Sequence, residues 1–242
     1  MIDIKNVSYK YSEGTFALRN VNLHIEVGEA IALIGVNGSG KSTLMKLING
    51  LITASDGKYL FEGKEITDKE LQKESFSKSF HKKIGFVFQN SEMQLFCSNV
   101  YDEIAFGPRQ MGMEEEEVKR RVEDTLRLLK IEDLKDRQPY HLSGGEKKKV
   151  AIATVVVLNP EVYIFDEPMN GLDPKTKRFL REFMIAINNA GKTILCSTHD
   201  FEYIQDVFKR AVVFSGDHTI IRDGKYDEIM KDKDFLYKNN II

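Results

Sequence analysis

The stretch EAIALIGVNGSGKSTLMKLING, residues 29–50, joins an apolar segment to a helical segment through a glycine-rich turn. The apolar run at 30–34 contains no charged residue, which is typical of a fully buried strand. Residues 41–50 have the pattern of a helix that ends at Gly50, because glycine favours the end of a helix. The stretch therefore predicts a strand, a turn and a helix in direct succession.

The turn GVNGSGKS, residues 35–42, fits the phosphate-loop pattern G-x-x-x-x-G-K-[ST] at every fixed position. Its glycines let successive backbone amides face a triphosphate, and the dipole of the following helix adds to the attraction. We expect Lys41 to reach the outer phosphates and the Ser42 hydroxyl to hold Mg²⁺. The expected ligands are therefore a nucleoside triphosphate and Mg²⁺.

A second polar feature is the pair of carboxylates that ends VYIFDE, residues 162–167. Successive side chains of a strand point in opposite directions, so Asp166 and Glu167 can have different roles. We expect Asp166 to join the Mg²⁺ shell and Glu167 to polarise an attacking water. An acid pair after a strand is by itself most often a helix cap or a turn, but the phosphate loop upstream favours the catalytic interpretation.

Composition narrows the class of protein. The chain has 242 residues and a formal net charge of −2, which argues against a nucleic-acid partner held by bulk electrostatics. Its longest apolar stretch, residues 150–158, is far shorter than the roughly 20 residues of a membrane-spanning helix. Cys97 and Cys196 stand alone in apolar surroundings, which predicts buried free thiols in a reducing cytosol rather than a metal site or a disulfide.

Strand and helix patterns predict the rest of the fold. Residues 2–11 and 21–27 alternate as two antiparallel strands, and further strands are expected at 57–63 and 83–89. Residues 91–157 read as a helical lobe inserted into a sheet. Within that lobe, one face of the helix expected at 114–130 carries four apolar residues: Val118, Val122, Leu126 and Leu129.

The last third of the chain alternates between strands and helices. Strands are expected at 162–165, 192–197 and 211–214, with helices beginning at Pro174 and Asp200. Such alternation predicts an α/β fold with a parallel sheet covered on both faces.

Five motifs occur in order along the chain: GVNGSGKST at 35–43, LSGGE at 142–146, VYIFDEP at 162–168, GLDP at 171–174 and STHD at 197–200. In this order and spacing, the chain resembles the ATP-binding subunit of an ABC transporter over essentially its whole length. The resemblance implies a single nucleotide-binding domain, 1–242, of the ABC-type P-loop NTPase fold, with a mixed sheet covered by helices and an antiparallel β subdomain. Its RecA-like core would comprise about 1–90 and 158–242, and about 91–157 would form an inserted α-helical signature lobe.

The resemblance explains the glycines that open the helix at LSGGE. In this family the signature motif serves the nucleotide held by a second subunit, which pairs head to tail with the first. A hydroxyl and bare amides at the positive end of a helix suit a γ-phosphate, and glycines keep side chains out of the way. The resemblance therefore assigns nucleotide contacts to Ser143, Gly144, Gly145 and Glu146.

Other roles carry over from the family position by position. Tyr11 matches the aromatic residue that stacks on adenine, and Gln89 matches the glutamine that meets Mg²⁺ and water and senses the transmembrane partner. Asp173 matches the acid of the loop that crosses the dimer interface, and His199 matches the histidine that contacts the γ-phosphate.

The expected site then has three overlapping sets of residues. The catalytic set is Glu167, His199, Gln89 and Lys41, and the metal ligands are Ser42, Gln89 and Asp166. The phosphate loop supplies the remaining contacts to ATP through Gly35, Asn37, Gly38, Ser39, Gly40, Lys41, Ser42 and Thr43.

The chain departs from the family pattern at a few positions. Glu146 replaces the commoner glutamine, Lys148 and Lys149 stand where Gln-Arg is usual, and Asn170 stands where a small residue is common. None of these removes an expected catalytic group, but they leave the packing of the signature helix open. We interpret the lysines at 147–149 as a solvated helix face, with an anionic partner as the alternative.

Residues 88–108, FQNSEMQLFCSNVYDEIAFGP, resemble the energy-coupling-factor and cobalt-type importers, whose ATPases carry a similar QLF followed by IAFGP. Those systems import vitamins or metal ions such as cobalt and nickel. In that group, acids of the neighbouring surface contact basic residues on helices of a transmembrane protein. We therefore expect Asp102 and Glu103 to belong to a docking groove.

The sequence thus predicts an ATP-hydrolysing subunit of a membrane importer, bound peripherally at the cytoplasmic face of the membrane. Its expected partners are a second ABC ATPase (identical or paralogous), a transmembrane coupling subunit and an integral substrate-binding subunit. A soluble ABC ATPase, for example of iron–sulfur cluster assembly, is the alternative, and the segment 88–108 favours the importer. A phosphate-loop kinase or GTPase acting alone is a third class, which the signature motif disfavours.

Overall fold

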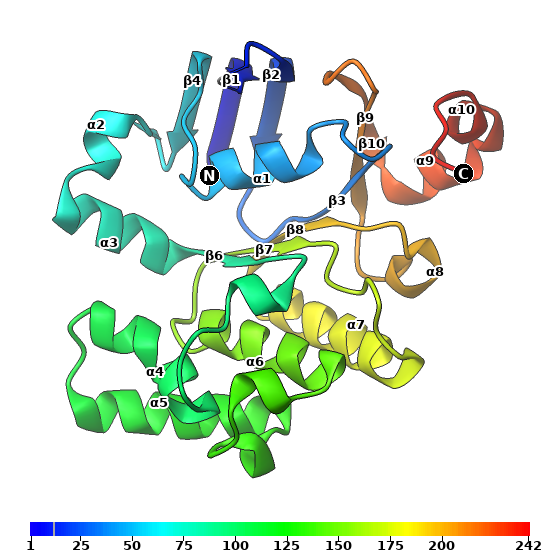
Figure 1. Ribbon diagram of the computed structural model, residues 1–242. Coiled ribbons are helices and arrows are strands. Elements are labelled where there is room, and N and C mark those ends of the chain that lie inside the picture. The colour runs from blue at the N-terminus through cyan, green and yellow to red at the C-terminus, as the bar shows by residue number, and fades with distance from the viewer. Residues whose placement is uncertain (12) are drawn as a thin grey trace.

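The computed structural model describes residues 1–11 and 13–242, which form two β-sheets with helices packed around them (Figure 1). The strands are β1 (Ile2–Lys10), β2 (Phe16–Ile25), β3 (Ala30–Gly35), β4 (Asp56–Phe61), β5 (Lys64–Glu65), β6 (Ile84–Val87), β7 (Val162–Asp166), β8 (Thr193–Ser197), β9 (Arg210–Phe214) and β10 (Ile220–Lys225). The helices are α1 (Lys41–Ile48), α2 (Asp68–Leu71), α3 (Glu74–Lys83), α4 (Val100–Gln110), α5 (Glu115–Leu129), α6 (Gly144–Val156), α7 (Pro174–Asn189), α8 (Phe201–Ile204), α9 (Tyr226–Lys231) and α10 (Lys233–Lys238). Short 3-10 helices lie at Ser91–Met93, Glu132–Leu134 and Pro139–His141.

The larger sheet has the strand order β10-β9-β3-β8-β7-β6. Its inner pairs, from β9 to β6, are all parallel, whereas β10 pairs with β9 antiparallel at one edge. The predicted parallel sheet is therefore confirmed, with one antiparallel strand added at the edge. Because the parallel strands share a direction, the loops that follow β3, β6, β7 and β8 meet at one edge of the sheet.

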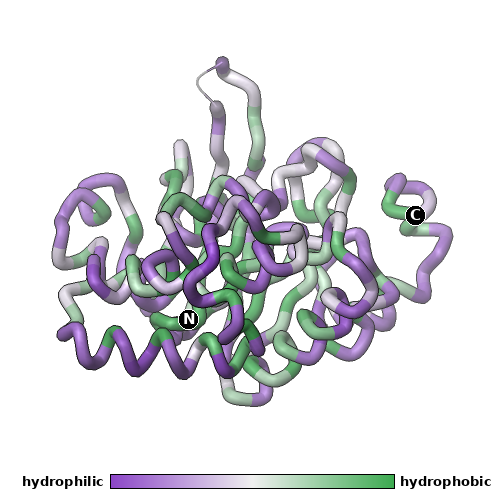
Figure 2. Tube along the Cα trace, turned by 60° about the horizontal axis from the view of Figure 1, so that its bottom comes forward, coloured by the Kyte–Doolittle hydropathy of each residue, from purple (hydrophilic) through white to green (hydrophobic). Residues whose placement is uncertain are grey.

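Both faces of this sheet are buried, as its continuous apolar strands predict. On β7, Tyr163 and Phe165 face a cluster formed with α4 to α7, while Val162 and Ile164 face the opposite cluster with α1. The other parallel strands alternate in the same way. Figure 2 shows hydrophobic residues along the central strands and mainly hydrophilic residues along the outer turns of the helices.

The smaller sheet has the order β2-β1-β4-β5, and all its neighbouring strands are antiparallel. The predicted antiparallel pairing of the first two strands is confirmed. β2, however, begins at Phe16 rather than near residue 21, because Phe16 and Leu18 pair with Lys10 and Tyr9 of β1. In Figure 1 this sheet lies on the α1 side of the larger sheet, and α1 runs between the two.

Helices α4, α5 and α6 follow β6 in the chain and lie together on the opposite side of the larger sheet (Figure 1). The predicted apolar face of α5 is confirmed, because Val118, Val122, Leu126 and Leu129 are all buried. α9 and α10 lie near the β9–β10 edge. Cys196 is buried and Cys97 is half-buried, and both are free thiols. In the part of the chain that is described, no helix is long and apolar enough to cross a membrane.

The contact between β6 and α6 gives a first prediction. An added Cβ at Gly85 would lie 2.2 Å from Cγ1 of Val155 on α6 and 3.0 Å from Cγ of Pro160. A β-branched residue in a helix has little freedom to rotate away. Gly85→Ala should therefore lower the free energy of unfolding by about 1–3 kcal/mol, measured by urea denaturation.

Gly107→Ala is the matched control. Gly107 lies within helix α4. Its added Cβ would make only an ordinary contact, 3.4 Å from Cδ1 of Leu158. Alanine is favoured over glycine inside a helix, so this variant should be stabilised by roughly 0.5–1 kcal/mol. Equal stability of the two variants would show that β6 does not pack against α6 as closely as the structure has it.

Candidate active site

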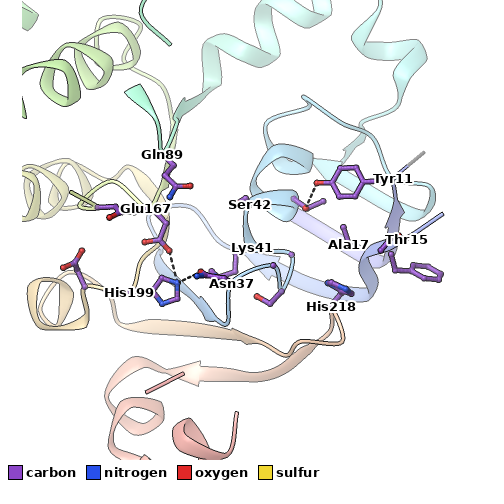
Figure 3. Close-up of a pocket in the computed structure, with 17 residues that line it drawn as sticks. Tyr11, Thr15, Ala17, Asn37, Lys41, Ser42, Gln89, Glu167, His199 and His218 are labelled. Atoms are coloured by element: carbon purple, nitrogen blue, oxygen red, sulfur yellow. Dashed lines mark hydrogen bonds and ion pairs between the residues drawn. The ribbon is translucent and has the colours of Figure 1, made fainter. Parts of the chain in front are cut away.

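A cavity of about 780 Å³ opens at the edge of the sheet where the parallel strands end (Figure 3). The phosphate loop follows β3, Gln89 follows β6, Glu167 follows β7 and His199 follows β8. The cavity is lined by Tyr11, Thr15, Phe16, Ala17, Asn37, Gly38, Ser39, Gly40, Lys41, Ser42, Thr43, Gln89, Glu167, Asn170, His199, Asp200 and His218. Most of the residues predicted to contact ATP are therefore brought together by the sheet topology.

The glycines of the phosphate loop are required by the backbone. Gly40 immediately precedes α1 with φ 107°, and an added Cβ there would lie 2.3 Å from the carbonyl oxygen of Ala17. Gly35 has φ 150°, and its Cβ would lie 2.5 Å from the carbonyl oxygen of Phe214. Gly38 has φ 78° but has open space where a Cβ would be. The loop is thus closely backed by β2 and β9 and open on the cavity side.

Lys41 lies at the start of α1 with its side chain buried. Its Nζ donates hydrogen bonds to the carbonyl oxygens of Gly35 at 2.7 Å and Val36 at 3.0 Å. Burial lowers the pKa of this amine, an effect opposed by the carboxylates of Glu167 and Asp166. Among the described residues, this buried cation has hydrogen bonds to carbonyl groups alone, so it is well placed to gain from an anionic ligand.

Asp166 ends β7 and is buried where three elements meet. Its Oδ1 accepts a hydrogen bond from the Ser42 hydroxyl at 3.0 Å and another from the Ser197 hydroxyl at 2.7 Å. Neighbouring hydroxyl and carboxylate oxygens are the ligands that Mg²⁺ prefers, so this pair fits the predicted metal position. Among the described residues, no group of three or more His, Cys, Asp or Glu side chains could hold a metal ion by itself.

Unlike Asp166, Glu167 lines the cavity (Figure 3). Its backbone has φ 43°, and its amide donates to the carbonyl and hydroxyl oxygens of Ser197. Its Oε1 lies 3.3 Å from Nε2 of His199, which is also 3.2 Å from Oδ1 of Asn37. Burial raises the pKa of Glu167, which favours proton uptake at this carboxylate.

Tyr11 lies at the other end of the cavity from Glu167 (Figure 3). Tyr11 is 44% exposed, and its ring packs edge to face with the ring of Tyr9. Its hydroxyl oxygen lies 3.1 Å from Oγ1 of Thr43. The ring is therefore free to contact a ligand that extends from the phosphate loop along the cavity. Gln89 lies near Glu167, on the loop after β6.

The predicted residues of the signature and interface loops lie in a different place. Ser143 caps α6: its hydroxyl accepts the Glu146 amide, and the Glu146 carboxylate accepts the Ser143 amide at 2.8 Å. Asp173 caps α7, accepting from the amides of Lys175 and Thr176. Ser143, Gly145, Glu146 and Asp173 line a second cavity, of about 500 Å³, that shares no lining residue with the first among those described.

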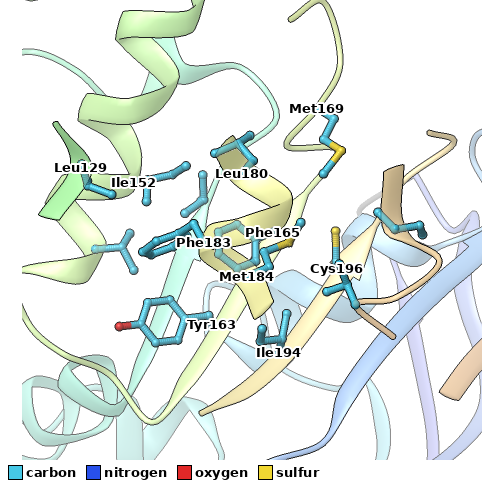
Figure 4. Close-up of a cluster of buried hydrophobic side chains, with 14 of the residues drawn as sticks. Leu129, Ile152, Tyr163, Phe165, Met169, Leu180, Phe183, Met184, Ile194 and Cys196 are labelled. Carbon is cyan, nitrogen blue, oxygen red and sulfur yellow. The ribbon is translucent and has the colours of Figure 1, made fainter. Parts of the chain in front are cut away.

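Gly145 lets the N-terminus of α6, capped by Ser143, lie close to the N-terminus of α7, capped by Asp173. An added Cβ would lie 2.9 Å from Oγ1 of Thr176 and 3.5 Å from Oδ2 of Asp173, whereas Gly144 has open space around it. The buried cluster of Figure 4 holds α6 and α7 against β7 through Ile152, Leu180 and Phe165. A glycine is therefore needed at 145 partly for packing against α7 in the same chain, which the motif alone did not reveal.

Several cavity residues were not predicted. Thr15, Phe16 and Ala17 of the β1–β2 hairpin line it, as does His218, which lies between β9 and β10. Nδ1 of His218 is buried without a hydrogen-bond partner among the described residues. No local pattern marks these positions, because only the packing of two distant hairpins brings them beside the phosphate loop.

The interpretation of residues 147–149 as a solvated helix face is wrong. Lys148 is 3% exposed, and its Nζ donates to the carbonyl oxygens of Phe88 and Gln89. Lys147 pairs with Glu92, and Lys149 lies over the ring of Phe179. The three lysines point to different sides of α6, as successive helical residues must.

The assignment of Glu103 to a docking groove is also wrong. Glu103 is 2% exposed and accepts hydrogen bonds from the amides of Phe96 at 2.8 Å and Cys97 at 2.6 Å. The side chain therefore fixes the loop before α4 and is closed to a partner. Asp102 remains 40% exposed, but it is already paired with the guanidinium of Arg109 at 3.0 Å.

Comparison with known proteins places this geometry in a family. The family model described as ABC transporter matches residues 18–170. A putative ABC transporter ATP-binding protein of Clostridium acetobutylicum is 57% identical over 242 residues, covering 100% of both chains. A nickel import ATP-binding protein of Lactiplantibacillus plantarum is 41% identical over 92% of both chains. An energy-coupling factor transporter ATP-binding protein of Methanothermobacter thermautotrophicus is 37% identical over 100% of this chain and 76% of the relative.

Solved structures agree with these relatives. CbiO1 of Clostridium perfringens, described as part of the ABC transporter complex CbiONQ, matches with a TM-score of 0.83 and 35% identity over 99% of this chain and 94% of that chain. A dimeric ATP-binding cassette in a post-hydrolysis state, bound to ADP and Pi, matches with a TM-score of 0.83 and 30% identity over 93% of this chain and 98% of that chain.

The raised pKa of Glu167 gives a prediction about stability. Because the carboxyl group has a higher pKa in the folded chain than in the unfolded chain, ionisation destabilises the fold, and this loss grows as pH rises through the two pKa values. Glu167→Gln cannot ionise and avoids the loss. In nucleotide-free protein, its Tm should therefore exceed that of the wild type by more at pH 8 than at pH 5.

Glu182→Gln, at an exposed position on α7, is the control for removing a carboxylate. Its Tm should differ from that of the wild type by a similar small amount at both pH values. A Glu167→Gln chain that is no more stable than the wild type at pH 8 would mean that the carboxylate is better solvated than the structure indicates.

Proposed function

This chain belongs to the ABC transporter family of ATP-binding proteins and is an ATPase, and we propose that it drives an importer of the energy-coupling-factor type. The proposed cargo is a vitamin or a transition-metal ion such as cobalt or nickel. The importer type is supported by the named relatives. The division of the site residues between two cavities of one chain supports a paired ATPase, in which the phosphate loop and the signature helix that serve one ATP come from two chains.

In the proposed site, each residue acts on ATP according to its place in the first cavity. The loop amides and Lys41 hold the β- and γ-phosphates, and Tyr11 stacks on adenine at the far end. Glu167 orients a water against the γ-phosphate and accepts its proton, and His199 stabilises the charge that develops on the phosphoryl oxygens. Gln89, beside Glu167, would contact Mg²⁺ and the water.

Mg²⁺ would be held by Ser42, Asp166 and Gln89 together with phosphate oxygens. When bound, the ion neutralises charge on the phosphates. Asp166 and Ser197 keep the Ser42 hydroxyl in position for it, because the same carboxylate oxygen accepts from both hydroxyls.

The second half of the site comes from another ABC ATPase, identical or paralogous. The N-terminus of α6 offers Ser143, Gly144 and Gly145 to a γ-phosphate bound by the partner, with the open space at Gly144 allowing close approach. Glu146 and Asp173 fix the two helix ends that meet the partner. The dimeric cassette bound to ADP and Pi supports this pairing.

An exposed apolar patch close to Gln89 supports a transmembrane partner. Met93 and Phe96 are 79% and 67% exposed, and the Phe96 ring meets that of Phe106 edge to face at 4.9 Å. The carboxylate of Glu103 holds the Phe96 amide, so the patch is presented on a fixed loop. We propose that helices of the coupling subunit dock on this patch, in place of the groove first expected at Asp102 and Glu103.

The importer type rests on the relatives. One is named for nickel import, one for an energy-coupling factor transporter, and one solved structure for the CbiONQ complex. We accordingly propose a peripheral position at the cytoplasmic face of the membrane, next to a coupling subunit and an integral substrate-binding subunit. We also propose that residues 91–157 move as a signature lobe against a core formed by 1–90 and 158–242.

Glu167→Gln tests the assigned base. Removing a general base should lower the kcat of ATP hydrolysis by about 10²–10⁴-fold. ATP affinity should be kept, because Gln retains the shape of the side chain and removes a negative charge from beside the phosphates. Phosphate release and the binding of a fluorescent ATP analogue measure the two quantities. A variant with wild-type kcat would remove Glu167 from this role.

The docking patch gives the test of the transport function. Phe96→Asp with Phe106→Asp should abolish co-purification with membrane proteins in mild detergent and leave ATP affinity unchanged, because both rings lie outside the ATP cavity. Tyr237→Asp, which alters an aromatic residue 76% exposed on α10, should co-purify as the wild type does. Recovery of soluble scaffold proteins instead of membrane subunits would favour iron–sulfur cluster assembly.

A further inference from the structure

A buried lysine links the two groups of site residues within one chain. Lys148 lies on α6, four residues after Gly144, and its side chain is 3% exposed. Its Nζ donates to the carbonyl oxygen of Phe88 at 3.0 Å and to that of Gln89 at 2.9 Å. The lysine therefore holds the backbone at the very residue whose side chain enters the ATP cavity.

The electrostatic surroundings make this contact specific. In the described part of the chain, no carboxylate lies within 4.0 Å of the Lys148 amine. Burial lowers the pKa of this amine to about 8, and the charge of Asp166 opposes the effect. The neighbouring lysines have other partners: Lys147 pairs with Glu92, and Lys149 lies over Phe179. The ammonium is thus stabilised mainly by the two loop carbonyls. A buried charge without hydrogen-bond partners strongly destabilises the fold. The loop at 88–94 and helix α6 should therefore move together, so that the two carbonyl contacts are kept.

Other contacts between the loop and α6 leave Gln89 itself free. Gln94 accepts the Phe88 amide and donates to the carbonyl oxygen of Ala151 and to the hydroxyl of Thr154. Lys147 reaches only the exposed side chain of Glu92. Among the described residues, Lys148 is thus the one α6 side chain with a hydrogen bond to the backbone of Gln89.

We propose that Lys148 is a positioning residue that couples the Gln89 loop to the N-terminus of α6. The inference rests on the proposed function, in which Gln89 serves the ATP of its own chain and Ser143 to Gly145 serve the ATP of the partner. A displacement of the loop is then carried along α6 to the opposite site. Lys148 is absent from the ATP cavity, so it acts through Gln89 and not on ATP.

The test compares Lys148→Met with Lys147→Met in the full chain. Lys148→Met keeps the length of the side chain and removes both carbonyl contacts, so kcat should fall at least about tenfold, since small misplacements of a catalytic group have large effects. The Kd of nucleotide should stay within about twofold of the wild type. Lys147→Met loses a pair with an exposed carboxylate and should keep kcat within about twofold. Lys148→Gln, whose shorter and uncharged side chain can still donate hydrogen bonds, should be intermediate.

Amide hydrogen exchange gives a readout that does not depend on turnover. In Lys148→Met, exchange at 88–94 and at 143–147 should speed up together by about tenfold or more, with the rest of the chain unchanged. Wild-type kcat in a folded Lys148→Met chain would overturn the proposal, as would faster exchange in one segment alone. If the wild type itself fails to hydrolyse ATP, the proposed function fails, and the exchange comparison still decides whether Lys148 couples the two segments.

Discussion

The hydrogen bonds that Asp166 accepts from Ser42 and Ser197 join the helix after the phosphate loop to the ends of β7 and β8. A buried carboxylate requires such donors, because burying an unpaired charge costs several kcal/mol. The next residue, Glu167, leaves the strand with φ 43°, its amide is held by Ser197, and its carboxylate lies in the cavity beside His199. Ser197 thus binds both Asp166 and the backbone of the proposed general base.

The predicted site residues are divided between two cavities of one chain. The ATP cavity contains the phosphate loop, Gln89, Glu167 and His199, whereas the caps at Ser143 and Asp173 line a separate cavity. In the proposed head-to-tail dimer the two kinds of surface would meet, and hydrolysis would depend on assembly. The exposed Phe96 follows Gln89 by seven residues along the chain. The proposed docking patch and the side chain that enters the ATP cavity therefore belong to neighbouring parts of one loop.

Local patterns in the sequence predicted the parts that depend on local chemistry. The phosphate loop, the apolar strands, the acid pair at 166–167 and the start of α6 after Ser143 each need particular residue types at fixed spacing, and all lie where expected. The capping box at Ser143 and Glu146 was not predicted. The prediction for Glu103 was wrong because the preceding loop folds back and its amides bind the carboxylate, which the helix pattern does not reveal. The prediction for Lys148 was wrong because its burial depends on carbonyl groups of a distant segment. His218 and the hairpin at Thr15 were missed for the same reason, since only tertiary packing brings them to the cavity.

The central claim, that each ATP site combines two chains, is tested most directly by mixing two inactive variants. Lys41→Ala removes the phosphate-binding amine, and Ser143→Arg blocks the start of α6, so each variant alone should lack ATPase activity. A mixed dimer retains one complete site, because an intact phosphate loop from one chain meets an intact signature helix from the other. The account predicts recovery of up to about a quarter of wild-type activity on mixing at random. No recovery in dimers that do form, or full activity of Ser143→Arg alone, would contradict it.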